Sequence, residues 1–315
     1  MACGYSKNYI LVDNADGLQE SLRELKSFKS KANLLAVDCE GVKLSREGEL
    51  TIVTVATEEK AYIFDVVKLK KVLFDEGLRE ILEDKSREKL MFDCRQDSDS
   101  LWHQYQVKLT GVLDVQLLEV MKRREEYGGS SLKFQLSRRS GRGSEVRRSD
   151  RGSEVEKIRG FNYCLELYTK DTRAINTKDK GRILLQSDRN LWKRRPISDV
   201  LLRYCAVDTL ELFKLYNKLK SANGEELSRL RLASERYTDL FRGKAVRSFD
   251  QYEGNGFLPL DVIPSEDGED NLTADTLCNG CKRLFPQDEF SEYQLRHNEQ
   301  KCRVCSSLRK RKLYY

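Results

Sequence analysis

Short apolar runs and longer amphipathic segments alternate along the first two-thirds of the chain. The segment that begins at Tyr9 predicts a short strand, a turn and then a helix with Leu18, Leu22 and Leu25 on one face. Further strands are predicted from runs of apolar and β-branched residues, at 34–42, 50–57, 60–66 and 89–93.

Helical periodicity dominates the chain after residue 93. The segment 112–124 predicts a short strand that passes into a helix. Ser198 or Asp199 can cap the start of a helix that comes after Pro196. Strands that come first, with helices interleaved and then dominant, predict an α/β fold around one sheet. Helices are predicted from the spacing of apolar residues at 67–84, 97–107, 160–168, 197–220 and 223–248.

Composition places the chain among globular proteins. Of its 315 residues, 39% are hydrophobic and 34% are charged, which is polar but not typical of disorder. No apolar run approaches the roughly 18 residues of a membrane span, and the first ten residues lack a signal-peptide pattern. We expect a nuclear or cytoplasmic protein without membrane contact, whose nine cysteines are thiols or metal ligands rather than disulfides.

Positive charge is concentrated in one stretch. Residues 122–160 hold twelve Lys or Arg against six Asp or Glu, a surplus that equals the net +6 of the whole chain. The stretch is poor in apolar residues and includes the near-repeat RGSEVRRSDRGSEV, which is typical of a loop. Two interpretations stay open: a solvated insertion without a role, or an arm that contacts phosphates.

Two carboxylates stand side by side at the end of a predicted buried strand. Asp38 and Glu40 are two residues apart in LLAVDCEGV, so the period of a strand puts them on the same face. Repulsion and desolvation disfavour such a pair unless a cation neutralises it or one carboxyl stays protonated. The pair therefore predicts a cation site or a protonated acid.

Other acidic residues and a tyrosine could join this pair. Asp97 stands at the start of a predicted helix, and Asp208 comes four residues after Tyr204, which puts both on one helix face. Magnesium and manganese prefer oxygen ligands of this kind. Two such ions, roughly 4 Å apart, can clamp the attacking and leaving oxygens of a phosphodiester displacement.

The same segments resemble a known family. VDCEG, DCRQDSDSL and YCAVD are similar to the three motifs of the tyrosine-bearing (DEDDy) branch of the DEDD exonucleases, whose members include RNase D and Werner-type enzymes. The resemblance covers roughly residues 8–220. LWKRRPISDVLLRYCAVD also resembles RNase D, and RGFNYCLELY resembles the Egalitarian-like subgroup of exonuclease-domain proteins.

This resemblance implies an RNase H-like fold, a mixed sheet flanked by helices, and hydrolysis of nucleic acid from the 3′ end with release of nucleoside monophosphates. Asp38, Glu40, Asp97 and Asp208 would bind two magnesium or manganese ions. Tyr204 would orient the attacking water or help to deprotonate it, and positioning is favoured because a phenol has a pKa near 10 in water.

The middle motif offers three aspartates, Asp93, Asp97 and Asp99. The family pattern places a leucine four residues after the metal-binding aspartate, and Leu101 stands in that relation to Asp97. We therefore assign the role to Asp97. Asp114 lies in a stretch that also resembles RNase D, and we expect it to be structural support.

The last forty residues carry a separate motif. Cys278 and Cys281 form one C-x-x-C pair, and Cys302 and Cys305 form a second after twenty intervening residues. Two such pairs predict a closed tetrahedral zinc site that is structural and supplies folding energy to a segment too short for a core of its own. His297 could compete as a ligand, but four cysteines already complete the site.

The sequence around these cysteines resembles small four-cysteine modules of RNA-silencing and chromatin adaptors, which implies a protein partner. The terminal RKRK, 309–312, could bind phosphates, direct nuclear import or have neither role. We expect three regions: an exonuclease domain at 8–222 with a basic insertion at about 123–160, a helical and acidic linker at 223–270, and a zinc module at 271–315.

The expected function is metal-dependent 3′–5′ exonuclease activity on single-stranded RNA or DNA ends. The alternative is a weak or inactive nucleic-acid-binding adaptor on the same fold that uses the zinc tail for protein contacts. No residue identifies the 2′-hydroxyl of RNA, and the sequence does not give an oligomeric state.

Overall fold

The structure, a computed structural model, divides the chain into two compact units. The first comprises residues 1–119 and 160–244, and the second comprises 120–159 and 245–315.

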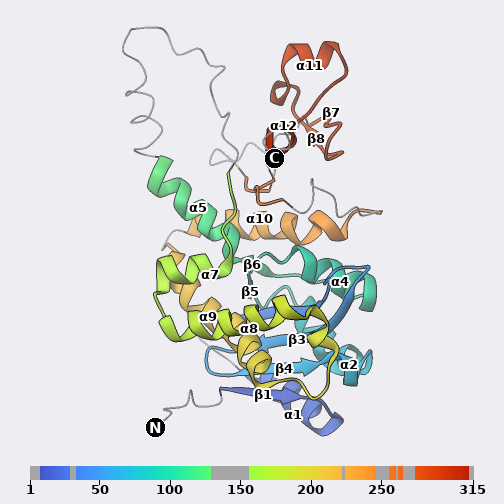
Figure 1. Ribbon diagram of the computed structural model, residues 1–315, viewed down its shortest axis with the longest axis vertical. Helices are drawn as coiled ribbons and strands as arrows, with labels where there is room; N and C mark the ends of the chain where they lie inside the picture. The colour runs from blue at the N-terminus through green and yellow to red at the C-terminus, as the bar shows by residue number, and fades with distance from the viewer. Residues whose placement is uncertain are drawn as a thin grey trace. The chain divides into compact units, whose positions relative to one another are not determined.

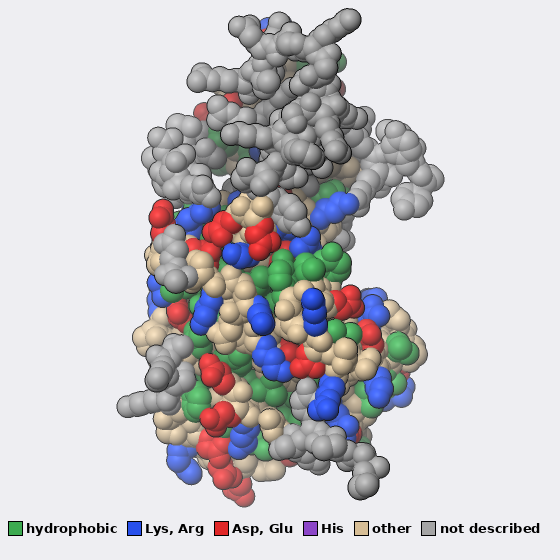
Figure 2. Space-filling model, turned by 90° about the vertical axis from the view of Figure 1, so that its left-hand side faces the viewer, with side chains coloured by type: hydrophobic (Ala, Val, Ile, Leu, Met, Phe, Trp, Pro, Cys, Tyr) green, Lys and Arg blue, Asp and Glu red, His purple; other side chains and the backbone are tan. Residues whose placement is uncertain are grey.

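Within the described residues, no helix combines the length and the hydrophobicity needed to cross a bilayer. Acidic and basic side chains are interspersed over the face that Figure 2 presents. The described residues are 8–28, 33–128, 156–221, 224–245, 255–259, 262–264 and 274–311.

A six-stranded mixed sheet forms the centre of the first unit, in the order β1-β4-β3-β2-β5-β6 (Figure 1). β2 lies between β3, to which it is antiparallel, and β5, to which it is parallel. Consequently β3 runs against the other strands of the sheet. The strands are β1 Tyr9–Val12, β2 Leu35–Val42, β3 Glu49–Ala56, β4 Ala61–Asp65, β5 Lys89–Met91 and β6 Val112–Asp114.

Helices flank this sheet. β3 and β4 are buried along almost their whole length, which is typical of strands covered on both faces. α9 crosses one face and contacts five strands, β1 to β5. The helices are α1 Ala15–Ser27, α2 Val66–Leu69, α3 Arg79–Glu83, α4 Arg95–Tyr105, α5 Val115–Gly128, α7 Phe161–Cys164, α8 Thr172–Ser187, α9 Asp199–Leu219 and α10 Gly224–Arg242, with short turns of π-helix at η1 Phe74–Leu78 and η3 Leu165–Thr169 and of 3₁₀-helix at η4 Arg189–Lys193.

The predicted strands and most predicted helices are present, with three differences. The helix expected at 67–84 is interrupted, because Lys70 and Gly77 adopt φ of 53° and 136°. The helix expected at 97–107 begins at Arg95, so Asp97 lies inside its first turn rather than capping it. α8 was not predicted.

α10 corresponds to the helix predicted at 223–248, and it packs against other elements of the first unit. It contacts α4 and β6. The hydroxyl of the buried Tyr237 donates a hydrogen bond to Gln116, and the Ser234 hydroxyl accepts one from the Asp114 backbone N–H. Part of the acidic segment after α10, 265–273, lies outside the described residues, and the domain boundaries stay a prediction.

The second unit has a small core of its own. Phe257, Phe285, Phe290 and Val304 are buried together with cysteine side chains. Of the predicted basic insertion, residues up to 128 continue α5, and 129–155 lie outside the described residues. The elements near the C-terminus are β7 Thr276–Leu277, β8 Leu284–Phe285, η5 Gln287–Glu289, α11 Glu292–Arg296 and α12 Arg303–Arg311.

Candidate active site

β2 presents two carboxylates on one face at the centre of the sheet. In the register with β3, Asp38 lies opposite Thr54 and Glu40 lies opposite Ile52. Cys39, between them, points to the opposite face, where it is buried. Because α9 packs against β2, the two carboxylates face the helix that carries the other predicted site residues.

A bulge ends the regular part of β2 directly after Glu40. The register with β3 shifts between Glu40 and Gly41. A Cβ on Gly41 would lie 2.0 Å from the backbone oxygen of Glu49, so a side chain cannot be accommodated there without backbone movement. The glycine thus permits the bulge, and bulges beside functional sites re-aim the neighbouring side chains.

α9 supplies Tyr204 and Asp208 from one face, as their spacing predicts. The Ser198 hydroxyl caps the helix by accepting a hydrogen bond from the Leu201 N–H. Just before the helix, the guanidinium of Arg195 bonds to the buried carboxylate of Asp65 at 2.5 and 2.7 Å. The start of α9 is therefore held to the end of β4.

Three of the predicted carboxylates converge. Asp38, Glu40 and Asp208 each offer an oxygen atom, and these oxygens lie within 4.8 Å of one another. One oxygen of Asp38, Oδ2, is buried and has no hydrogen-bond partner among the described residues. A cluster of carboxylates with an unsatisfied oxygen fits a divalent cation such as magnesium or manganese, which binds oxygen ligands.

Asp97 lies beside this cluster but is held differently. Its Oδ1 accepts a hydrogen bond of 2.9 Å from the backbone N–H of Cys39, between the two acidic residues of β2. Burial and then the charge of Asp38 raise the pKa of the buried Asp97 carboxyl. Asp97 is not in the group whose oxygens approach within 4.8 Å, so its role as a ligand stays a prediction.

The other two aspartates of the middle motif have partners of their own. Asp93 forms an ion pair with Arg95, with oxygen-to-nitrogen distances of 2.5 and 2.7 Å. Asp99 is fully buried and accepts hydrogen bonds from the backbone and guanidinium of Arg46. Of the three aspartates, Asp97 is the one that these contacts place against β2.

Asp114 has the supporting position that its sequence context predicts. Its carboxylate is buried and accepts hydrogen bonds of 2.9 Å from the backbone N–H groups of Cys94 and Gln116. It thereby links the segment that precedes α4 to the start of α5. Burial raises the pKa of Asp114 to about 6.

Lys178 of α8 is a site residue that the sequence motifs did not reveal. Its side chain is buried, and its ammonium group donates a hydrogen bond to Oδ1 of Asp208. The same nitrogen lies 4.5 Å from the ring centre of Tyr204 and 4.7 Å from that of Phe161. The surrounding sequence, NTKDKGR, is strongly polar, so it does not indicate a buried helix. The one available signal was that Lys178 and Gly181 are three residues apart, which puts them on the same face if the segment is helical.

Burial dominates the electrostatics of the cluster. It raises the pKa of Asp38 to about 6, although the positive charge of Lys178 opposes the shift. Burial and then the charge of Asp38 raise the pKa of Glu40 well above its ordinary value. The crowding of like charges expected from the sequence is therefore present, and a lysine relieves part of it.

Tyr204 is positioned by packing. Its hydroxyl has no hydrogen-bond partner among the described residues, and its ring meets Trp192 edge-on at 6.2 Å between ring centres. Burial and then the charges of Glu40 and Asp38 raise the pKa of the phenol. A phenol with a raised pKa stays protonated at neutral pH, so it can donate a hydrogen bond but is a poor base.

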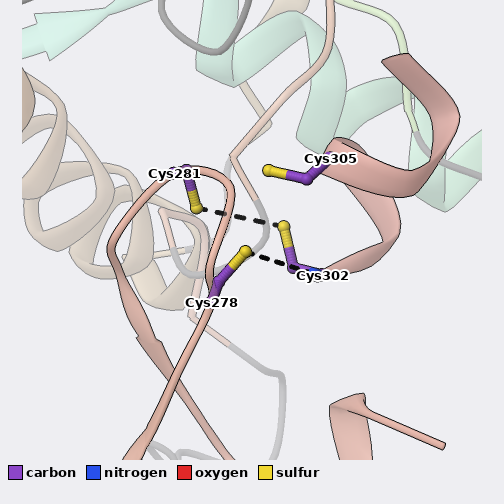
Figure 3. Close-up of side chains that lie close together, drawn as sticks. All are labelled: Cys278, Cys281, Cys302 and Cys305. Carbon is purple, nitrogen blue, oxygen red and sulfur yellow. Dashed lines mark hydrogen bonds between the residues drawn. The ribbon is translucent and has the colours of Figure 1, made fainter. Parts of the chain in front are cut away.

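The four predicted cysteines of the second unit also converge (Figure 3). Their sulfur atoms lie within 4.8 Å of one another. The sulfurs of Cys281 and Cys302 are 4.0 Å apart, and the Cys302 N–H donates to the sulfur of Cys278. All four, Cys305 included, are free thiols. This arrangement fits a tetrahedral zinc ion.

The four thiols interact with one another. Hydrogen bonds among them lower the pKa of Cys278 and Cys281 and raise the pKa of Cys302 and Cys305. His297 is not in the cluster; it stacks on Tyr293 with 4.1 Å between ring centres. The cysteines of the first unit, by contrast, are separate buried thiols, as expected: Cys39, Cys94, Cys164 and Cys205.

Comparison with known proteins supports the exonuclease resemblance. Residues 9–140 match the family described as 3′–5′ exonuclease. This stretch includes Asp38, Glu40 and Asp97 but ends before α9. The chain is 38% identical over 114 residues to the piRNA biogenesis protein EXD1 of Mus musculus, a match that covers 36% of this chain and 20% of that protein. The chain thus spans about a fifth of the length of this relative.

Solved structures confirm the fold. Trypanosoma brucei RNase D superposes with a TM-score of 0.55 at 22% identity, over 77% of this chain and 76% of that one. The same protein in complex with RNA U12 gives a TM-score of 0.54 at 19% identity, over 89% and 92% of the two chains. The first unit therefore has the RNase D-like exonuclease fold that the motifs implied.

Proposed function

We propose that this protein is a metal-dependent exonuclease that shortens single-stranded RNA from its 3′ end. The convergence of Asp38, Glu40 and Asp208 around an unsatisfied carboxylate oxygen carries this proposal. RNA is favoured over DNA as the substrate because the similar mouse protein is named for piRNA biogenesis and the similar RNase D was solved with RNA.

The residues would divide the work between them. Asp38, Glu40 and Asp208, with Asp97 beside them, would hold magnesium or manganese. The bound metal would neutralise charge on the scissile phosphate and activate water. Tyr204, protonated and with a hydroxyl that no described residue engages, would orient that water by a hydrogen bond. The four cysteines of the second unit would hold one structural zinc ion.

One observation favours a second candidate, an RNA-binding adaptor that does not cleave. Lys178 already occupies part of the carboxylate cluster through its bond to Asp208, and a lysine held there could exclude the metal. In that case the four-cysteine unit, which exposes Leu284 and Tyr293, would serve for contacts with a protein.

Cleavage of RNA labelled at its 5′ end tests the two candidates. We expect the purified protein to produce a ladder of products shortened from the 3′ end with manganese or magnesium. Asp38→Asn should abolish the ladder without unfolding the protein, because it removes a charge from the crowded cluster at nearly constant volume. Tyr204→Phe should slow cleavage by about 10² to 10⁴, the range for one positioned acid–base group.

Asp75→Asn is the matched control, because Asp75 is an exposed carboxylate of the same unit, and it should leave cleavage unchanged. Cleavage that persists in Asp38→Asn would place the activity elsewhere. RNA binding without cleavage in either metal would favour the adaptor. Equal cleavage of single-stranded DNA would reject the preference for RNA.

A further inference from the structure

Lys178 is a buried cation inside the carboxylate cluster. Its relative exposure is 5%, and that of its partner Asp208 is 8%. Besides the bond to Asp208, the negative charges of Asp38 and Glu40 act on its ammonium group. The face of Tyr204 lies against the same nitrogen, an arrangement that favours a positive charge. All three carboxylates of the cluster thus interact with this one group.

Lys178 lies on α8, a helix whose start is held in place by hydrogen bonds. Asp171 caps α8 by accepting hydrogen bonds from the N–H groups of Arg173 and Ala174. The other oxygen of Asp171 bonds to Lys214 of α9 at 3.0 Å, so the start of α8 is tied to the helix that carries Asp208. One turn after Lys178, Gly181 allows α8 to approach α9 closely. The position of the ammonium group is therefore set by helix packing.

Lys178 and a second divalent ion would compete within the cluster. Asp38, Glu40 and Asp208, with Asp97 beside them, carry four negative charges when all are ionised, which two divalent ions would cancel without help. Because the ammonium group of Lys178 is also present, two divalent ions would leave a surplus of one positive charge. A second divalent ion would in addition compete with Lys178 for Oδ1 of Asp208.

We propose that Lys178 takes the place of one of the two divalent ions, so that the protein without RNA binds a single magnesium or manganese ion in the cluster. This inference rests on the proposed function, since it concerns the same carboxylates. Lys178 then limits the number of bound ions. A second ion binds only when the ammonium group of Lys178 has moved away from Asp208.

Counting bound manganese tests the inference without any reaction. Electron paramagnetic resonance of free Mn²⁺, titrated into the full zinc-loaded chain without RNA, should give one ion per wild-type chain. Lys178→Met keeps the length of the side chain and removes the charge, so two ions should bind. Lys178→Gln should behave likewise and provides a second, polar variant should the methionine variant fail to fold.

Lys180→Met is the matched control, because Lys180 is exposed on the same helix, and it should still bind one ion. Two ions in the wild type and two in the Lys178 variants would overturn the inference but leave the proposed function standing. Fewer ions in the Lys178 variants than in the wild type would show that the lysine organises the site, which also overturns it. No ion in any variant would overturn both the inference and the proposed function.

Discussion

Asp38 and Asp114 are two aspartates of the first unit whose pKa burial raises to about 6, yet their oxygens are held differently. Both carboxylate oxygens of Asp114 accept backbone hydrogen bonds, from Cys94 and Gln116. Oδ2 of Asp38 has no partner among the described residues. A buried carboxylate oxygen without a partner is costly, so Asp38 is suited to bind a cation. Asp114, whose oxygens are both engaged, instead positions the backbone segments to which it is bonded.

The pH dependence of stability should report on Asp114. Its folded-state pKa of about 6 lies above its ordinary value of 3.8, so the folded protein holds the proton more tightly than the unfolded chain. The resulting stabilisation is full below about pH 4 and is lost as the pH rises through 6. Asp114→Asn removes this contribution together with a hydrogen bond to the Cys94 N–H.

Denaturant unfolding of wild type and Asp114→Asn between pH 4 and 7 checks this expectation. The difference in the free energy of unfolding should shrink by about 2 to 3 kcal/mol as the pH rises through this window. At low pH the variant should be the less stable one, because the Cys94 N–H then lacks its acceptor. A difference that does not change with pH would contradict the raised pKa.

At the scale of residues, local spacing predicted part of the site. The interval of two between Asp38 and Glu40, and of four between Tyr204 and Asp208, predicted that each pair shares a face. In the structure Asp38 and Glu40 lie together with Asp208, and Lys178 contacts both Asp208 and the ring of Tyr204. Lys178 could not be found in this way, because its bond to Asp208 spans thirty residues and depends on how α8 lies on α9. No local pattern encodes such a packing contact.

At the scale of elements, the contact of α8 with α9 depends on a glycine. A Cβ on Gly181 would lie 2.3 Å from Cδ2 of Tyr204 and 2.9 Å from Cγ, which is closer than real side chains approach. Gly181 therefore determines both where Lys178 enters the cluster and where the Tyr204 ring stands. This requirement outweighs the general preference for alanine inside a helix.

Gly181→Ala should destabilise the protein by about 1 to 3 kcal/mol, the usual cost of overpacking. In the absence of the clash, the same change within a helix would stabilise by up to about 1 kcal/mol, so the sign of the effect is diagnostic. Denaturant unfolding measures it. Gly160→Ala is the control, since a Cβ there meets nothing within 4 Å. A more stable Gly181→Ala would show that the helices do not lie this close.

The sequence predicted elements well where the pattern is strong and failed where backbone conformation or polarity hides it. The apolar run of β3 and the leucines of α1 gave clear signals. The break within 67–84 depends on positive φ at Lys70 and Gly77, and lysine gives no local warning of such a conformation. α8 was missed because its fully buried residues are small or polar, namely Ala174, Lys178 and Gly181. Its leucines, Leu184 and Leu185, come only near its end, where they pack partly buried against the core.

At the scale of the whole molecule, the two units differ in their described apolar cores. The first has an extensive apolar core around its sheet, whereas the cluster around the cysteines in the second includes only a few other apolar side chains. Phe257 belongs to that core, although the zinc module was predicted to begin at residue 271. A fragment that begins after Phe257 would therefore lack part of the core that packs around the cysteines.

Cys302→Ser in the full chain should separate the two units. The change removes one of the four proposed ligands, so bound zinc should fall from about one equivalent per chain to well below half. The second unit should then unfold, because the proposed zinc ion would supply its folding energy. Metal analysis measures the zinc, and limited proteolysis should then degrade the second unit while the first stays resistant. Cys164→Ser, the same change at a buried thiol outside the cluster, should keep its zinc. Loss of both units together in Cys302→Ser, or zinc retained in full, would contradict an independent zinc-stabilised unit.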